Sequence, residues 1–407
     1  MDERLFRRLL EPDGQRLIAA AAAGDLSERG RLGVSERLRR FAPADLATAA
    51  LETAVLRERA RAKFSRADAL YATREALEQA TSETVARHRA GRFAGYGPVA
   101  DLGCGIGGDA LALAAVTNVI GVDRDGLRLR MARENARAYG VEGRTTWLRA
   151  EIADGGPVRV AAAFVDPARR SVAGGRTFDV RAYQPPLAEV LGWRARFELL
   201  AVKVAPGIPD EAVAGSGAEV EFVALGDDLK EAVLWFGAGI TPLRRATLLP
   251  SGAQLFAERD QPCRVAGAGA VLYEPNAAVI RAHLIGLLAH ALDGWQIDPS
   301  IAYLCADSVR PTPFARAWLV ETVLPFSVDG VRRYLRARAV GRVTVKKRGS
   351  PLEPESFARM LHLKGSEERT VVLTRQQGRH VAIICAARSV GADDREKGRT
   401  NAALWTA

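Results

Sequence analysis

The stretch that decides the fold is VADLGCGIGGDALALAAVTNVIGVD, residues 99–123. It begins with a short apolar run containing Asp101, continues through four glycines into a helical segment, and closes with a second apolar run ending at Asp123. Glycines permit positive φ angles and let a ligand approach the backbone closely. An acid that ends the second strand can bind ribose hydroxyls. The stretch therefore predicts a strand–loop–helix–strand unit that binds an adenosine-containing cofactor.

The charges around the glycine loop distinguish among such cofactors. A P-loop is excluded, because no Lys-Ser or Lys-Thr pair follows the glycines. Asp101 and Asp109 flank the loop and would repel the pyrophosphate of a dinucleotide, whereas S-adenosylmethionine brings an ammonium and a sulfonium group. We therefore expect S-adenosylmethionine, with a nicotinamide dinucleotide as the alternative. The predicted cofactor-binding residues of the loop and second strand are Asp101, Gly103, Cys104, Gly105, Gly107 and Asp123.

The pattern of apolar residues changes along the chain. Short apolar runs alternate with helical segments after about residue 96, which is typical of an α/β fold with a parallel sheet covered on both faces. The preceding residues are rich in Ala, Leu, Glu and Arg and are predicted to be helical. After residue 240 we expect short strands, one long helix containing His283 and His290, and a final hairpin. The predicted domains are an N-terminal helical domain at 1–95, an α/β domain at 96–240, a small α+β ferredoxin-like segment at 241–325 and a basic domain at 326–407.

Three motifs resemble those of the class I S-adenosylmethionine-dependent methyltransferases. DLGCGIGGD resembles the first motif of the family, VIGVD the second, and LRAEIAD lies where the family has an acid next to the adenine. The resemblance implies that Glu151 contacts the adenine, with Asp154 as the alternative. It covers residues 96–240 and implies a Rossmann-like seven-stranded methyltransferase sheet, whose reversed seventh strand is Ala232–Phe236.

The segment FVDPARR, residues 164–170, ends the predicted fourth strand. Asp166 is therefore expected at the carboxyl edge of the sheet, where open α/β sheets bind ligands. There it can accept a proton or a hydrogen bond from an attacking nitrogen or hydroxyl, and Pro167 stiffens the turn. Arg169 and Arg170 either stack on a base or hold a phosphate, or they belong to a solvated loop.

FVDPARR also resembles the Asp-Pro-Pro-Tyr loop of amino-directed nucleic-acid methyltransferases, from which Ala168 and Arg169 depart. The segment contains no cysteine, so a covalent cytosine-C5 mechanism is not expected. Lys203 lies inside an otherwise apolar fifth strand, AVKVAPG. A buried lysine is costly unless its ammonium reaches a polar group. Lys203 is therefore a further catalytic candidate, either at the rim of the pocket or in an internal ion pair.

Positive charge is concentrated near the C-terminus. Residues 331–364 contain ten Lys or Arg and two acids, which is most of the net charge of +10. The segments RVTVKKRG, FARMLHLKG and TVVLTRQQGRHVAIIC resemble the THUMP-like module at the C-terminus of certain bacterial class I methyltransferases. This resemblance implies RNA binding, and adjacent cations at a strand end are typical of phosphate contacts. The predicted nucleic-acid-binding residues are Arg342, Lys346, Lys347 and Arg348.

Composition limits the remaining possibilities. The 407 residues are 48% hydrophobic and 26% charged, which is ordinary for a globular protein. No apolar run reaches about 18 residues, so no membrane partner is expected. The N-terminus is charged and lacks an apolar signal core, so we expect a cytoplasmic protein. The four cysteines form no CxxC pair, so neither a metal site nor a disulfide is expected.

These observations predict a methyltransferase that uses S-adenosylmethionine and acts on RNA, either transfer or ribosomal RNA. One alternative is a methyltransferase for a small molecule or a protein. The other is an RNA-binding protein with a vestigial catalytic pocket. The sequence carries no indication of an oligomeric state.

Overall fold

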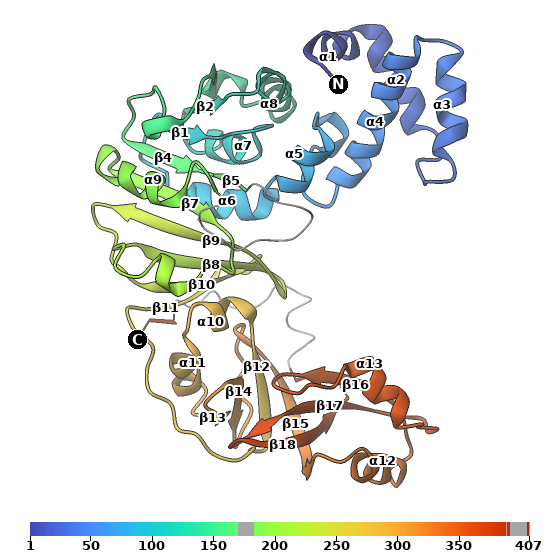
Figure 1. The fold of residues 1–407 in the computed structure, drawn as a ribbon, viewed down its shortest axis with the longest axis vertical. Helices are drawn as coiled ribbons and strands as arrows, with labels where there is room; N and C mark the ends of the chain where they lie inside the picture. Colours follow the sequence, from blue (N-terminus) through green and yellow to red (C-terminus); the bar gives the residue numbers. More distant parts are fainter. Residues whose placement is uncertain (170–182, 388, 391–404, 407) are drawn as a thin grey trace. The chain divides into compact units, whose positions relative to one another are not determined.

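The structure is a computed structural model that describes residues 1–169, 183–387, 389–390 and 405–406 (Figure 1). The chain forms two compact units. The N-terminal unit comprises Met1–Ala218 and Val233–Ile240, and the C-terminal unit comprises Glu219–Ala232 and Thr241–Ala407. In the described parts of the chain, no helix is both long and apolar enough to cross a bilayer.

Six helices precede the first strand, as the helical pattern predicts. Asp2 caps the first of them by accepting a hydrogen bond from the Leu5 amide at 2.8 Å, and Pro12 occupies the first position of the second, where its missing N–H costs nothing. The helices are α1 (Glu3–Leu10), α2 (Pro12–Ala22), α3 (Arg31–Arg39), α4 (Ala44–Ala60), α5 (Arg74–Gln79) and α6 (Glu83–Gly91).

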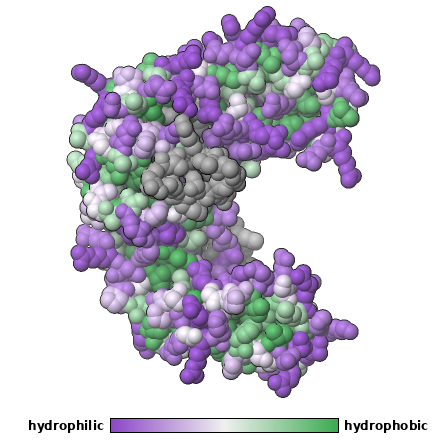
Figure 2. Space-filling model, viewed as in Figure 1, coloured by the Kyte–Doolittle hydropathy of each residue, from purple (hydrophilic) through white to green (hydrophobic). Residues whose placement is uncertain are grey.

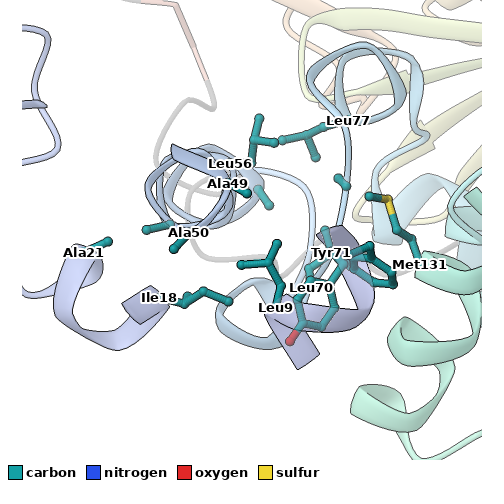
Figure 3. Close-up of a cluster of buried hydrophobic side chains, with 14 of the residues drawn as sticks. Leu9, Ile18, Ala21, Ala49, Ala50, Leu56, Leu70, Tyr71, Leu77 and Met131 are labelled. Carbon is teal, nitrogen blue, oxygen red and sulfur yellow. The ribbon is translucent and has the colours of Figure 1, made fainter. Parts of the chain in front are cut away.

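The N-terminal helices share a hydrophobic core with the α/β part of the same unit. Figure 3 shows Leu9, Leu70 and Tyr71 gathered beside Met131, which lies on a helix of the α/β part. Ile106 of the glycine loop belongs to the same cluster. Tyr71 is buried and makes an edge-to-face contact with Phe6 at 5.2 Å between ring centroids. The helical region is therefore packed against the loop rather than tethered to it.

Asn135, which is fully buried, joins these two parts by hydrogen bonds. Its Oδ1 accepts from the Tyr71 amide at 2.8 Å, and its Nδ2 donates to the Tyr71 carbonyl and the Ile106 carbonyl, both at 3.0 Å. One side chain therefore satisfies three backbone groups, two on the helical region and one on the glycine loop.

Asn135→Ala is expected to destabilise the protein by about 2–4 kcal/mol, because it leaves buried backbone groups without partners. Thermal and urea unfolding measure this loss. Asn118→Ala, at an exposed position before the second strand, is the control and should change stability by less than about 0.5 kcal/mol. Equal effects of the two substitutions would contradict the bridging role.

In the α/β part, six neighbouring strands of a larger sheet follow the order β9-β7-β4-β1-β2-β3. β1 pairs in parallel with β2 and β4, β2 with β3, and β4 with β7, which confirms the predicted parallel α/β fold. A short antiparallel ladder after β4, formed by β5 and β6, was not predicted. The elements are β1 (Val99–Leu102), α7 (Gly108–Ala114), β2 (Val119–Asp123), α8 (Gly126–Tyr139), β3 (Thr145–Arg149), β4 (Ala162–Val165), β5 (Ala168–Arg169), β6 (Tyr183–Gln184), α9 (Leu187–Gly192), β7 (Leu199–Val204) and β9 (Asp228–Gly237).

The C-terminal unit begins with β8 (Glu219–Leu225), which pairs in parallel with β10 (Arg244–Leu249). β10 pairs antiparallel with β11 (Ala253–Ala257), which also pairs with β19 (Trp405–Thr406). A second sheet has the order β13-β14-β12-β15-β18-β17-β16. Its elements and the neighbouring helices are β12 (Val271–Pro275), α10 (Ala277–Arg281), α11 (Ile285–Ala291), β13 (Trp295–Asp298), β14 (Ile301–Ala306), β15 (Ala315–Pro325), α12 (Val328–Arg336), β16 (Val340–Lys347), α13 (Pro354–Met360), β17 (Glu367–Gln376) and β18 (Arg379–Ala386).

The second sheet is mostly antiparallel, and β15 runs through its centre. Residues Ala315–Leu319 pair with β12, and Val320–Pro325 pair with β18. β15 therefore pairs with strands from both of the predicted segments, 241–325 and 326–407. The four-domain division stays a prediction. On the face drawn in Figure 2, hydrophobic residues form scattered patches between hydrophilic ones, as on most folded proteins.

The single long helix predicted around His283 and His290 is wrong. The structure has two short helices, α10 and α11, and His283 between them has a φ of +53°. Asp260 caps α11 by accepting hydrogen bonds from the Gly286 amide at 2.9 Å and the Leu287 amide at 2.8 Å. A Cβ on Gly286 would lie 1.7 Å from a backbone oxygen of the same distant segment. The contact with the segment around Asp260 therefore begins a new helix, although the helical periodicity of the apolar residues continues without a break.

Candidate functional site

The predicted acidic residues meet at the carboxyl edge of the parallel sheet. Asp101 lies near the end of β1, Asp123 ends β2, and Asp166 follows β4. Because these strands are adjacent and parallel, their carboxyl ends lie side by side. The fold thus brings together residues that are 65 positions apart, from 101 to 166, in the sequence.

The glycine loop has the tight backbone that its composition predicts. Gly103, Gly105 and Gly107 all have positive φ angles, of +85°, +55° and +85°. A Cβ on Gly103 would lie 3.3 Å from the Asp166 carbonyl oxygen, so the loop passes close to the end of β4. The Gly105 amide donates to Oδ2 of Asp123 at 2.8 Å. The loop is therefore held between the ends of β2 and β4.

Asp123 is buried at the end of β2. Its Oδ2 accepts from the Gly105 amide, and its Oδ1 accepts from the Asp125 amide at 2.9 Å. Each carboxylate oxygen has one further lone pair. Asp123 can therefore accept hydrogen bonds from two ribose hydroxyls without giving up the bonds that orient it.

Asp101 is the most unusual residue of the site. It is 1% exposed, and neither of its carboxylate oxygens has a hydrogen-bond partner among the described residues. Burial raises the pKa of Asp101 well above its usual range, the carboxylates of Asp109 and Asp166 raise it further, and the Arg89 guanidinium opposes them. A buried carboxylate without a partner is costly. Its presence indicates a cationic ligand.

Two residues that sequence analysis missed, Arg89 and Thr81, complete the surroundings of Asp101. The buried Arg89 forms an ion pair with Asp109 and lies 4.2 Å from the ring centroid of Phe164. Thr81 donates to Oδ2 of Asp109 at 3.1 Å. The signal in the sequence is that Arg89 interrupts the apolar face of α6. Its pairing also corrects the charge argument: Asp109 is neutralised by Arg89, so Asp101 carries more of the discrimination against a pyrophosphate.

Lys203 is in an ion pair, and that pair belongs to the site. Its Nζ lies 2.6 Å from Oδ2 of Asp166 and 3.0 Å from Oγ1 of Thr81. The side chain of Lys203 is 11% exposed and that of Asp166 32% exposed. Lys203 therefore fixes one oxygen of Asp166 on the buried side, and the carboxylate remains accessible from solvent.

The charges around Asp101 fit S-adenosylmethionine. The site contains more acids than bases, so it favours a ligand with an ammonium and a sulfonium and disfavours one with phosphates. The unpartnered Asp101 carboxylate is the group that a ligand ammonium would satisfy. The charged groups are Asp101, Asp109, Asp123, Asp166, Arg89 and Lys203.

The remaining predicted site residues differ in their exposure and in their backbone contacts. Glu151 is exposed just beyond β3, at the same edge of the sheet. Cys104 is buried, burial raises the pKa of its thiol well above the usual value, and its amide donates to the Val122 carbonyl at 3.1 Å. Pro167 is buried, and the backbone of Arg169 pairs with β6. Arg170 lies outside the described residues.

The predicted nucleic-acid-binding cations lie on β16 and just after it. Arg342 pairs with Glu368 at 2.7 Å, Lys346 with Glu274 at 2.6 Å and Lys347 with Glu353 at 2.5 Å. The Arg348 guanidinium lies 5.4 Å from the ring centroid of Tyr303. Three of the four cations therefore have a carboxylate partner within the chain, and their contact with nucleic acid stays a prediction.

Comparison with known proteins adds three family matches and several relatives. Residues 97–186 match the family described as RNA cap guanine-N2 methyltransferase, residues 315–387 match the THUMP domain-like family, and residues 2–60 match a domain of unknown function. Uncharacterized S-adenosylmethionine-dependent methyltransferases from two strains of Mycobacterium tuberculosis, CDC 1551 and H37Rv, are each 38% identical over 339 residues, which is 80% of this chain and 92% of the relative. A crystal structure from Porphyromonas gingivalis W83, described as that of a candidate methyltransferase, has a TM-score of 0.71 at 19% identity and covers 85% of this chain and 92% of its own.

Proposed function

This chain belongs to the S-adenosylmethionine-dependent methyltransferases with a C-terminal THUMP-like domain, and we propose that its methyl acceptor is RNA, either transfer or ribosomal. The observation that carries the proposal is the match of residues 97–186 to a family described as acting on RNA cap guanine. This match includes both the glycine loop and Asp166. The THUMP-like match at 315–387 and the basic charge of the C-terminal unit support it.

The cofactor side of the proposed mechanism depends on three acids and the loop. Asp101 attracts the ammonium of the cofactor, the loop amides approach its carboxylate, and Asp123 accepts hydrogen bonds from the ribose. Glu151, at the end of β3, is proposed to contact the adenine. When bound, the cofactor supplies an electrophilic methyl group on its sulfonium.

On the acceptor side, Asp166 is proposed to orient the attacking nitrogen or hydroxyl and accept a hydrogen bond or proton from it. Lys203 acts as a positioning residue, because its ammonium holds Oδ2 of Asp166 at 2.6 Å. Pro167, Arg169 and Arg170 are proposed to line the acceptor side, with the arginines stacking on a base or holding a phosphate.

Binding of S-adenosylmethionine is expected to strengthen as the pH rises. Burial and neighbouring carboxylates raise the pKa of Asp101 in the ligand-free protein, so this side chain stays protonated at acidic pH. Only the ionised form attracts an ammonium, so binding releases a proton. The association constant should therefore rise about tenfold per pH unit below the raised pKa and level off above it. Calorimetry over a pH series measures this, and a flat profile would contradict the role of Asp101.

Mass spectrometry of nucleosides tests the proposed function most directly. Total RNA from a strain that lacks the gene should lack one methylated nucleoside, and the gene should restore it. Restoration by wild type but not by a cofactor-binding variant would assign the methylation to this protein. An unchanged set of nucleosides, with methyl transfer to a small molecule or protein in extracts, would overturn the proposal.

A further inference from the structure

We propose that RNA is held on a basic face formed by α12 with the residues that follow it and the turn after α13, rather than by the cations of β16. This inference rests on the proposed function, because it takes RNA as the partner. We call this surface the α12 face, and it comprises residues 331–338 and 359–364.

Hydrogen bonds hold the two segments of the α12 face together. Nη2 of Arg332 donates to the Met360 carbonyl at 2.7 Å, and Nη2 of Arg336 donates to the His362 carbonyl at 2.8 Å. Beneath them, apolar residues of α12 and α13 share one core with β16, β17 and β18. The two segments are therefore fixed relative to each other, and Arg332 and Arg336 do not have to be ordered separately when a ligand binds.

The charge of the α12 face has one sign. Its two segments contain no Asp or Glu, and Arg332 alone among its cations has a carboxylate partner in the described residues, Asp329. Hydrogen bonds from arginines to carbonyls leave the positive charge in place. Such a face suits a phosphate backbone, whose contacts with Lys and Arg release counterions. The cations are Arg332, Arg333, Arg336, Arg338, Arg359 and Lys364.

The α12 face also offers a planar group. The Arg338 guanidinium lies 3.7 Å from the ring centroid of Tyr334, so the two groups stack. Arginine planes and tyrosine rings are the surfaces on which unpaired bases stack in single-stranded RNA. A lipid surface would use the charge but not this stack, which favours RNA over a membrane as the partner.

The cations of β16 are in a different situation. Val343 and Val345 pack in the core beneath α12 and α13, and side chains alternate along a strand, so Arg342 and Lys346 point to the opposite face of the sheet. Lys346 is 22% exposed and lies 4.9 Å from the ring centroid of Trp318, besides its ion pair with Glu274. A phosphate would have to compete with these carboxylates.

Two charge-matched double variants of the full chain test the proposal. Arg333→Gln with Lys364→Gln removes two exposed cations of the α12 face, and Arg342→Gln with Lys346→Gln removes the two cations of β16 that point to the opposite face of the sheet. Filter binding to bulk transfer RNA and to a single-stranded RNA oligonucleotide is measured over a salt series. We expect the first variant to lose roughly tenfold to a hundredfold in affinity. Its slope of log K against log salt should fall by about 1.4–1.8, since each phosphate contact contributes about 0.7–0.9.

The β16 variant should stay within about twofold of wild type at every salt concentration. Thermal unfolding of both variants confirms that they fold. An equal or larger loss of RNA affinity in the β16 variant, or no loss in the α12-face variant, would overturn the assignment of the α12 face as the RNA-binding surface. Neither result would contradict the proposed function. If the wild-type protein binds neither RNA, the proposed function fails and the surface with it.

Discussion

Asp101→Asn is expected to weaken the binding of S-adenosylmethionine by roughly a hundredfold to a thousandfold, which corresponds to about 3–4 kcal/mol. The substitution keeps the shape of the side chain and removes the charge that attracts the ammonium. In the ligand-free protein it should have the opposite effect on stability. Both oxygens of Asp101 are buried without hydrogen-bond partners among the residues that the structure describes, and its carboxylate is surrounded by other acids. Calorimetry measures the affinity, and thermal unfolding without the cofactor should show a higher melting temperature.

Asp125→Asn is the matched control for this experiment. Asp125 caps α8 by accepting hydrogen bonds from the Leu127 amide at 2.9 Å and the Arg128 amide at 3.2 Å. Asparagine caps helices about as well as aspartate, so neither affinity nor stability should change much. If Asp101→Asn bound the cofactor as tightly as wild type, the charge of the site could not be the basis of cofactor choice.

Asp166→Asn is expected to lower the rate of methyl transfer to RNA by about 10²- to 10⁴-fold, the range typical of a lost general base. The cofactor should still bind, within a few-fold of wild type at neutral pH. At acidic pH it should bind more tightly, because removing the Asp166 charge lowers the pKa of Asp101, which Asp166 raises. The measurement is transfer of a labelled methyl group to RNA from a strain that lacks the gene, together with calorimetry over a pH series.

Two substitutions of Lys203 test the role of its ion pair with Asp166. Lys203→Met should reduce turnover, because Asp166 loses the ammonium that holds one of its carboxylate oxygens in place. Lys203→Arg should recover part of the activity, since it keeps a cation near Asp166. A purely structural role for Lys203 would lower the melting temperature of Lys203→Met, and the turnover of its folded fraction would then equal that of wild type. Full turnover in Asp166→Asn would exclude the carboxylate from the chemistry.

Local sequence predicted the cofactor loop and the parallel sheet. The glycines have the positive φ angles that their composition indicates, and Asp101, Asp123 and Asp166 lie at one edge of the sheet. These features could be predicted because they depend on short segments. A turn needs particular backbone angles, and a parallel sheet places all strand ends on one side.

The partners of the charged side chains could not be predicted in this way. Arg89 and Thr81 reach Asp109 across 20 and 28 positions of sequence, and Lys203 reaches Asp166 across 37. Asp260 begins α11 from 26 positions away. In each case the deciding contact is long-range, and no local pattern specifies which distant group will arrive.

The sequence by itself determined the class of cofactor, the α/β fold and the position of the basic segment. Glycine conformation, apolar periodicity and charge are properties of neighbouring residues. Only the tertiary structure decided which charges are paired and which are open to a ligand. Within the described part of the chain, Asp101 has no hydrogen-bond partner while Asp109 has one, and Lys346 is in an ion pair while Arg333 is exposed. The physical reason is that the interaction energy of a charged group depends on its burial and on the groups that folding brings close to it.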